Sequence, residues 1–218
     1  MRANERLVAD DGYEVLLFPL EYLYMSQDEG GSYSHLYTYS IDLLGWGVNG
    51  RKLKCPYYAP CTCKCVQRGT GSVVWESVNK VHFADGTLDY VTFHFAHDDN
   101  TSNHYVGQVI QQGNLIGHTG TTGNVTGDHL HLNTARGHYA GFYDVGTGHY
   151  QLVNSTHVYD TMYVNDTTIL QGYGHNWRTY SGGHTPVEPK KYKFKWVLYA
   201  NKLREKMSTW HFFLFVLF

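Results

Sequence analysis

The chain has 218 residues, enough for one large or two small domains with a sizeable hydrophobic core. Its formal net charge is -2, with 17 Lys+Arg, so the composition gives no indication of nucleic-acid binding. Abundant Tyr, Thr, Val and Gly, with few helix-forming stretches, predict a mainly β fold.

The N-terminal region contains no apolar run that would form a signal-peptide core, so we expect no secretory signal there. An extracellular role would then require another exit, such as incorporation into a virion or release by lysis. Residues 13–24 are expected to be extended, because Pro19 prevents a regular helix or a central ladder position. A loop opened by Gly30 and Gly31 should follow.

The four cysteines lie close together in the sequence. Cys61, Cys63 and Cys65 alternate along a predicted strand and should share one face. Neighbours two apart on a strand lie near the upper limit of Cα separation for a disulfide, which disfavours pairing among them. The spacing, which includes Cys55, also lacks the CxxC pattern of a closed zinc site. We expect small, half-buried strand residues, with a metal or disulfide role as the alternative.

The middle of the chain contains several predicted strands. Residues 61–67 and 72–81 should pair as a hairpin through the Gly-rich loop 68–71, and residues 88–97 form a strong β-branched and aromatic run. A shorter strand is expected at 105–110. His94 and His97 are three apart, so an extended strand would point them to opposite faces. We therefore expect only His97, at the strand end beside a polar loop, to join a site.

A histidine pair follows a glycine-rich run. His129 and His131 should share one strand face while Leu130 and Leu132 pack on the other. A rigid strand can aim two imidazoles into one pocket, which suits a metal site. In a chain with 14 histidines the pair alone is weak evidence.

A hydrolytic zinc site needs about three protein ligands and one open position. Upstream, His35 and Asp42 offer an imidazole and a carboxylate. Seven positions apart on one regular strand, they would face opposite ways, so both reach a metal only if a turn or a bulge intervenes. The ordinary alternative is a surface histidine and a turn aspartate. Tyr33, Tyr37, Tyr39 and Trp46 lie near this pair and are candidates to line a groove.

The C-terminal third is less regular. Residues 154–174 can form a peripheral helix or irregular loops, and 181–189 are expected to be a linker. We therefore predict a domain over 1–185, a basic segment over 186–211 and an apolar tail over 212–218. The tail is far too short to span a bilayer, which takes about 20 residues. It is either an artefact of the sequence end or a buried or membrane-touching segment.

The run GHTGTTGNVTGDHLH at residues 117–131 resembles the closing G-x-[TS]-G, TG and HLH motifs of the M23 family. These are lysostaphin- and LytM-like zinc endopeptidases that cut peptides in bacterial cell walls. Residues 58–60 also resemble the start of the family's APxxG segment, and the resemblance covers about residues 13–137. It implies an antiparallel β-sheet with a groove over the sheet and irregular peripheral loops.

The resemblance also implies functional residues. His35, Asp42 and His131 would bind one zinc ion per chain, and His97 and His129 would be catalytic histidines that do not bind it. Which of these two is the general base stays open. The commonest family pattern is HxxxD, whereas six residues separate His35 from Asp42, so Asp98 and Asp128 are the alternative carboxylates. The implied substrates are the peptide stems or cross-links of peptidoglycan.

Within the family, the chain is similar to the peptidase domain of tail-tip proteins from small podophages infecting Gram-positive bacteria, also at residues 193–200. This implies a phage virion protein acting on the host wall beside other tail proteins, or one released by lysis. In those proteins a lysozyme-like domain precedes the peptidase. This chain lacks such a domain, so it is a fragment of a longer protein, a stand-alone domain or a variant architecture, and the sequence leaves these three alternatives open. The alternatives to an enzyme are a noncatalytic wall-binding module and a structural tail protein with a closed metal site.

Overall fold

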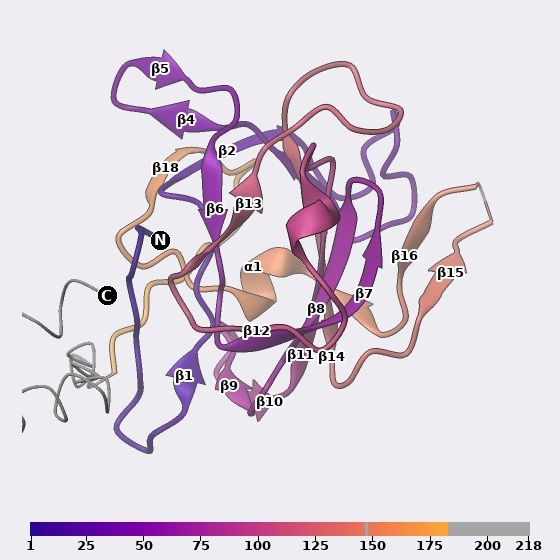
Figure 1. The fold of residues 1–218 in the computed structure, drawn as a ribbon. Coiled ribbons are helices and arrows are strands. Elements are labelled where there is room, and N and C mark those ends of the chain that lie inside the picture. The colour runs from indigo at the N-terminus through magenta and orange to yellow at the C-terminus, as the bar shows by residue number, and fades with distance from the viewer. Residues whose placement is uncertain (147, 183–218) are drawn as a thin grey trace, which may run out of the picture. The chain divides into compact units, whose positions relative to one another are not determined.

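A large mixed β-sheet forms the centre of the computed structural model, which describes residues 1–146 and 148–182 (Figure 1). The basic segment 186–211, the apolar tail 212–218 and the linker from residue 183 onward lie outside the described residues. Within the described residues, the mainly β expectation is confirmed, because strands greatly outnumber the single α-helix, α1 (Val158–Thr161), and one 3-10 turn (Thr101–Asn103). None of the helices described is long and apolar enough to cross a membrane.

Nine of the described strands make the central sheet, in the order β12-β7-β8-β11-β14-β3-β2-β18, with β17 also paired to β14. All of these pairs are antiparallel except β18 with β2, which is parallel. The strands are β2 (Tyr22–Gln27), β3 (Ile41–Leu43), β7 (Cys63–Gly69), β8 (Ser72–Ser77), β11 (Val91–Ala96), β12 (Val109–Ile110), β14 (Leu130–Arg136), β17 (Ser155–Thr156) and β18 (Thr168–Gln171).

Smaller sheets of two or three strands surround the central one. They are β1 (Glu14–Val15) with β9 (Val81–His82) and β10 (Leu88–Asp89), β4 (Trp46–Gly47) with β5 (Gly50–Arg51), β6 (Pro56–Tyr58) with β13 (Leu115–His118), and β15 (Phe142–Asp144) with β16 (Tyr150–Leu152).

The β7–β8 hairpin is tighter than its sequence suggested. Gly69 pairs with Ser72, so only Thr70 and Gly71 connect the strands. Gly71 has a φ of +67°, a left-handed conformation that two-residue hairpin turns require. Glycine adopts this conformation without strain, whereas a residue with a side chain would be strained there. The second strand ends at Ser77 rather than 81, because Val81 joins β1 and β10 in a separate sheet.

Aromatic and aliphatic side chains from both ends of the described chain fill the core. Leu130 and Leu132 are buried on the face of β14 opposite His131, as the alternation predicted. The four cysteines are all free thiols and all buried, so the expectation of half-buried side chains is wrong. They pack in the same core cluster as Trp75. Burial raises the pKa of the Cys61 thiol well above its usual range, which makes it an unreactive core residue.

Candidate metal centre and active site

Two side chains of the site are set by sheet register. Asp42 on β3 lies directly opposite His131 on β14. Residues opposite each other in an antiparallel pair project from the same face, so their side chains meet. Asp42 Oδ1 lies 3.1 Å from His131 Nδ1.

The third side chain comes from the turn that the spacing required. Residues His35 to Thr38 form a β-turn in which Thr38 N–H donates to the His35 carbonyl at 2.9 Å, and Tyr37 has a φ of 63°. The turn brings the chain back over β3 and β14. His35 Nε2 thereby lies 3.2 Å from both Asp42 Oδ1 and His131 Nδ1.

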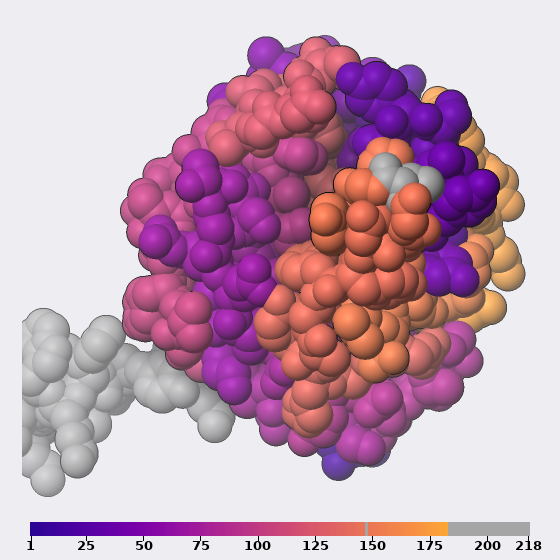
Figure 2. All heavy atoms as spheres, turned by 90° about the vertical axis from the view of Figure 1, so that its right-hand side faces the viewer, coloured from indigo at the N-terminus to yellow at the C-terminus, as the bar shows by residue number. Residues whose placement is uncertain are grey.

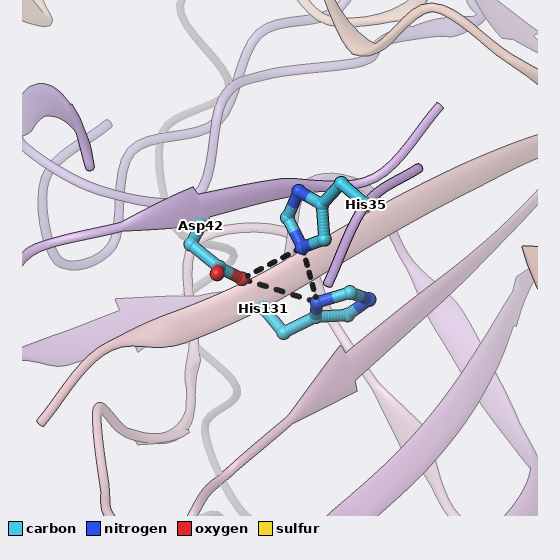
Figure 3. Close-up of side chains that lie close together, drawn as sticks. All are labelled: His35, Asp42 and His131. Carbon is cyan, nitrogen blue, oxygen red and sulfur yellow. Dashed lines mark hydrogen bonds and ion pairs between the residues drawn. The ribbon is translucent and has the colours of Figure 1, made fainter. Parts of the chain in front are cut away.

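The three donor atoms form a nearly equilateral triangle (Figure 3). Its edges of 3.1–3.2 Å are close to the ~3.3–3.4 Å between ligands on a tetrahedron with zinc bonds of about 2.0–2.1 Å. Two imidazoles and a carboxylate are also ligands that zinc takes in hydrolytic sites. The residues therefore fit a zinc ion with one open position. The same donor set also suits non-haem iron.

Asp42 is held as a carboxylate within this cluster. Burial alone would raise its pKa, but hydrogen bonds from His131 and His35, and their charges, hold that pKa well below its usual range. Its second oxygen accepts a hydrogen bond of 3.3 Å from Gln27 Nε2, which also donates to Ser34 Oγ at 2.7 Å. The sequence did not identify Gln27 as a site residue, because a polar residue at the end of a strand is common and belongs to no motif.

His97 follows β11 in an unusual backbone conformation. Its φ is 76°, and its N–H donates to the Gly71 carbonyl at 2.7 Å. Because His97 adopts this left-handed backbone conformation, the alternation of side chains between the two faces of β11 stops there. The rings of His94 and His97 therefore both lie near His131, with centroids 5.7 Å and 5.8 Å away. The expectation that these two histidines point to opposite faces is wrong.

His97 and His129 are arranged in the same way. The Nδ1–H of His97 donates to the Thr122 carbonyl at 2.9 Å, and that of His129 donates to the Gly127 carbonyl at 2.8 Å. In the neutral ring this leaves Nε2 unprotonated. Their ring centroids are 4.6 Å apart, and His129 Nε2 lies 3.6 Å from Asp42 Oδ1. Burial, reinforced by the neighbouring histidines, lowers the pKa of His97 to about 4. His97 is therefore neutral at physiological pH.

His94 is a further histidine beside His131 and was not expected there. Its Nε2 is 2.8 Å from Ser72 Oγ, and its ring packs edge-on against Phe142. Burial lowers its pKa to about 3, with the charges of His131 and His97 adding to the effect. His94 is therefore neutral at physiological pH, and it is not among the residues that line the groove.

The glycine-rich run before the histidine pair has a structural role. A Cβ at Gly120 would overlap the carbonyl oxygen of His97, and one at Gly117 would overlap the Asp98 carboxylate. Thr119 Oγ1 donates to Asp128 Oδ1 at 2.5 Å. This packing sets the position of His97 relative to the strand that follows.

Neither alternative carboxylate lies in the donor triangle. Asp98 Oδ2 accepts hydrogen bonds from Tyr57 O–H at 2.9 Å and from the His118 N–H at 3.0 Å. Asp128 accepts from Thr119 and from the Lys54 N–H. Both carboxylates fasten loops together.

A groove runs over the candidate site, and Figure 2 views the face where its walls meet. One wall is the loop 124–128, another comes from Tyr33 and Ser34, and a third from residues 148–150 at the start of β16. Asp42, His97, His129 and His131 line its floor. Tyr33 and Tyr150 are 67% and 62% exposed at the rim, so both offer aromatic surface to a ligand. Trp46 instead stacks on Tyr24 at 4.7 Å and does not line this groove.

No protein-family model matches the chain. Morphogenesis protein 1 of Bacillus phage B103 is 40% identical over 174 residues, which cover 77% of this chain and 45% of that protein. The chain thus spans less than half the length of this curated relative.

Solved structures with similar folds include three peptidases. One is a zinc-containing peptidase from Vibrio cholerae, with 19% identity and a TM-score of 0.41 over 60% of this chain and 43% of that one. Another is the catalytic domain of lysostaphin from Staphylococcus simulans, with 19% identity and a TM-score of 0.35 over 56% and 80%. The M23 metalloprotease pseudoalterin, from the deep sea, has 14% identity and a TM-score of 0.40 over 78% and 94%.

Proposed function

We propose that this chain is a zinc metalloendopeptidase of the M23 family that hydrolyses peptide stems or cross-links of bacterial peptidoglycan. The observation that carries the proposal is the donor triangle of His35, Asp42 and His131, two of whose members, Asp42 and His131, line an open groove. Two further histidines border the triangle, and both have Nδ1 bonded to a backbone carbonyl. A structural metal would be enclosed by a fourth protein ligand, whereas two of these three donors line a groove.

The chemistry divides between the metal and the chain's own side chains. When bound, zinc supplies Lewis acidity toward the substrate carbonyl and lowers the pKa of a coordinated water toward about 7. His97 and His129 then share the proton transfers. One accepts a proton from the attacking water through its free Nε2. The other, once protonated, stabilises the developing oxyanion or donates to the leaving amine.

We further propose that the protein acts from a phage virion, at the tail tip, on the wall of its host. The phage morphogenesis protein that matches 77% of the chain supports a phage origin. Peptide cleavage there would open a local hole in a thick wall during genome delivery. Its other partners would be phage tail proteins, and release by lysis is the alternative route to the wall.

Digestion of purified peptidoglycan, with and without a chelator, tests the proposal. We expect soluble peptides that disappear with chelator and return when zinc, but not iron, is restored. Mass analysis of these peptides identifies the bond that is cut. Binding to the wall without peptide release would instead identify a noncatalytic wall-binding module. Neither binding nor release, with a retained metal, would identify a structural tail protein.

A further inference from the structure

The second ring nitrogen of His35 is fixed by the backbone of a neighbouring loop residue. His35 Nδ1–H donates to the Asp28 carbonyl at 3.1 Å, and this bond turns Nε2 toward Asp42 and His131. Histidines that bind metals usually donate their other N–H in this way, and that bond sets the tautomer and the ring direction. The position of Asp28 therefore determines where His35 points.

Asp28 and its neighbour are held by a segment far along the chain. His175 Nε2 lies 2.8 Å and 2.9 Å from the two Asp28 carboxylate oxygens. His157 Nδ1 lies 2.5 Å from Glu29 Oε2. Two adjacent carboxylates thus bind two histidines that are 18 positions apart in the sequence.

Tyr159 fills the space between those two histidines. Its ring stacks on His157 at 4.8 Å with planes 22° apart, and on His175 at 4.2 Å with planes 14° apart. Trp177 meets Tyr159 edge-on at 6.1 Å and the core residue Phe18 at 5.6 Å. The stack is therefore anchored in the hydrophobic core.

We propose that His157, Tyr159 and His175 are positioning residues that clamp the turn carrying His35. We call these three residues, with Asp28 and Glu29, the clamp. The inference rests on the proposed function, because it treats His35 as a metal ligand. It adds that the donor triangle is formed before metal binds.

The physical reason is conformational entropy. Residues 28–40 contain no strand, so they would sample many conformations if nothing held them. A free turn would have to be ordered when metal binds, and the cost would appear as weaker affinity. The clamp orders the turn during folding instead, which is a form of preorganisation.

The test compares His175→Ala with His175→Gln. The alanine removes the bond to Asp28, whereas the glutamine amide nitrogen can replace His Nε2 as a donor. His138→Ala is the matched control, because His138 lies 2.9 Å from Glu76 Oε1 and packs on Tyr90 at 4.2 Å, away from the turn. All variants are made in the full chain. Tyr159→Leu removes the stacked ring as an independent variant.

Two measurements are made on each variant. Zinc affinity comes from competition with a chromogenic chelator. Hydrogen exchange in the metal-free protein follows the amides of Gly30, His35 and Thr38, whose N–H groups form the turn's own bonds. Exchange at Leu132, in the central sheet, reports the global stability of the fold.

We expect His175→Ala and Tyr159→Leu to weaken zinc binding by about 10–100-fold and to speed exchange at the three turn amides but not at Leu132. His175→Gln should retain most of the parent's zinc affinity and most of its slow exchange at the turn amides. His138→Ala should match the parent in both measurements. Unchanged affinity and exchange in His175→Ala would overturn the clamp, as would faster exchange at Leu132 to the same degree. A parent protein that binds no zinc would refute the proposed function, whereas exchange without metal separately reports whether the clamp holds the turn.

Discussion

Asp42 and His131 lie directly opposite each other in neighbouring antiparallel strands, with Asp42 Oδ1 3.1 Å from His131 Nδ1. Two of the three donor atoms are thus set by the register of β3 and β14. A slip of one residue would move one of the side chains to the other face of the sheet. Only His35 depends on a turn.

This relationship predicts the effect of removing a donor. The purified protein should contain about one zinc per chain, since one triangle of donors is present among the described residues. His131→Ala and Asp42→Ala should each lose the zinc and the wall-lytic activity. Elemental analysis of the dialysed proteins measures the metal. Full zinc content in Asp42→Ala would contradict its assignment as a ligand.

His129 and His97 should behave differently from the donors. His129→Ala and His97→Ala should keep most of the zinc and lose about 10²–10⁴-fold in peptide release, the usual contribution of a general acid or base. Zinc content and release of soluble peptides are measured on the same preparations. Wild-type activity in His129→Ala would remove it from the proposed mechanism.

Asp98 provides a test against the alternative carboxylate assignment. Asp98→Ala should retain zinc, because its carboxylate bonds to Tyr57 and His118 and not to the donor triangle. It should lose about 1–3 kcal/mol in the free energy of unfolding, since the buried Tyr57 hydroxyl is left without its acceptor. Urea unfolding and metal analysis measure the two effects. Zinc loss in a folded Asp98→Ala protein would reverse the assignment.

Gly120 should not tolerate a side chain. Gly120→Ala places a Cβ against the His97 carbonyl, and relief of that overlap should cost about 1–3 kcal/mol in the free energy of unfolding. Gly69→Ala is the matched control, because its Cβ would meet Ser72 at an ordinary 3.9 Å. Equal unfolding midpoints in urea for both variants would contradict this prediction, because they would show that the loop carrying Gly120 moves to accept the side chain at no cost.

The metal-free protein should lose stability in acid. Burial lowers the pKa of His94 to about 3, against about 6.5 in the unfolded chain. Between these values the unfolded chain binds the extra proton, so stability is complete above pH ~6.5 and falls as the pH falls toward about 3. For one such group the slope approaches about 1.4 kcal/mol per pH unit. His94→Gln should flatten this dependence in urea unfolding measured from pH 7 to pH 4 with chelator. An unchanged slope would show that His94 is not the group responsible.

The local sequence pattern was sufficient for several elements. Period-two alternation placed Leu130 and Leu132 in the core and His131 on the opposite face, because neighbouring side chains on a strand alternate. The seven-residue separation of His35 and Asp42 required an intervening turn, and a turn is present at His35 to Thr38. These features depend only on residues near each other in the chain.

Other features depend on contacts between distant residues. The positive φ of His97 is held by bonds to Gly71 and Thr122, so strand alternation alone wrongly put His94 and His97 on opposite faces. In the same way, the bonds of Asp28 to His175 join positions 147 residues apart.

The sequence by itself determined a mainly β chain in which His129 and His131 are presented on one face, since both follow from local periodicity and composition. Tertiary structure alone decided that Asp42 is the carboxylate that meets His131 and His35, while Asp98 and Asp128 fasten loops. Strand register and loop packing bring together residues from separate parts of the chain, and no local pattern encodes which of several carboxylates will be the one that meets them.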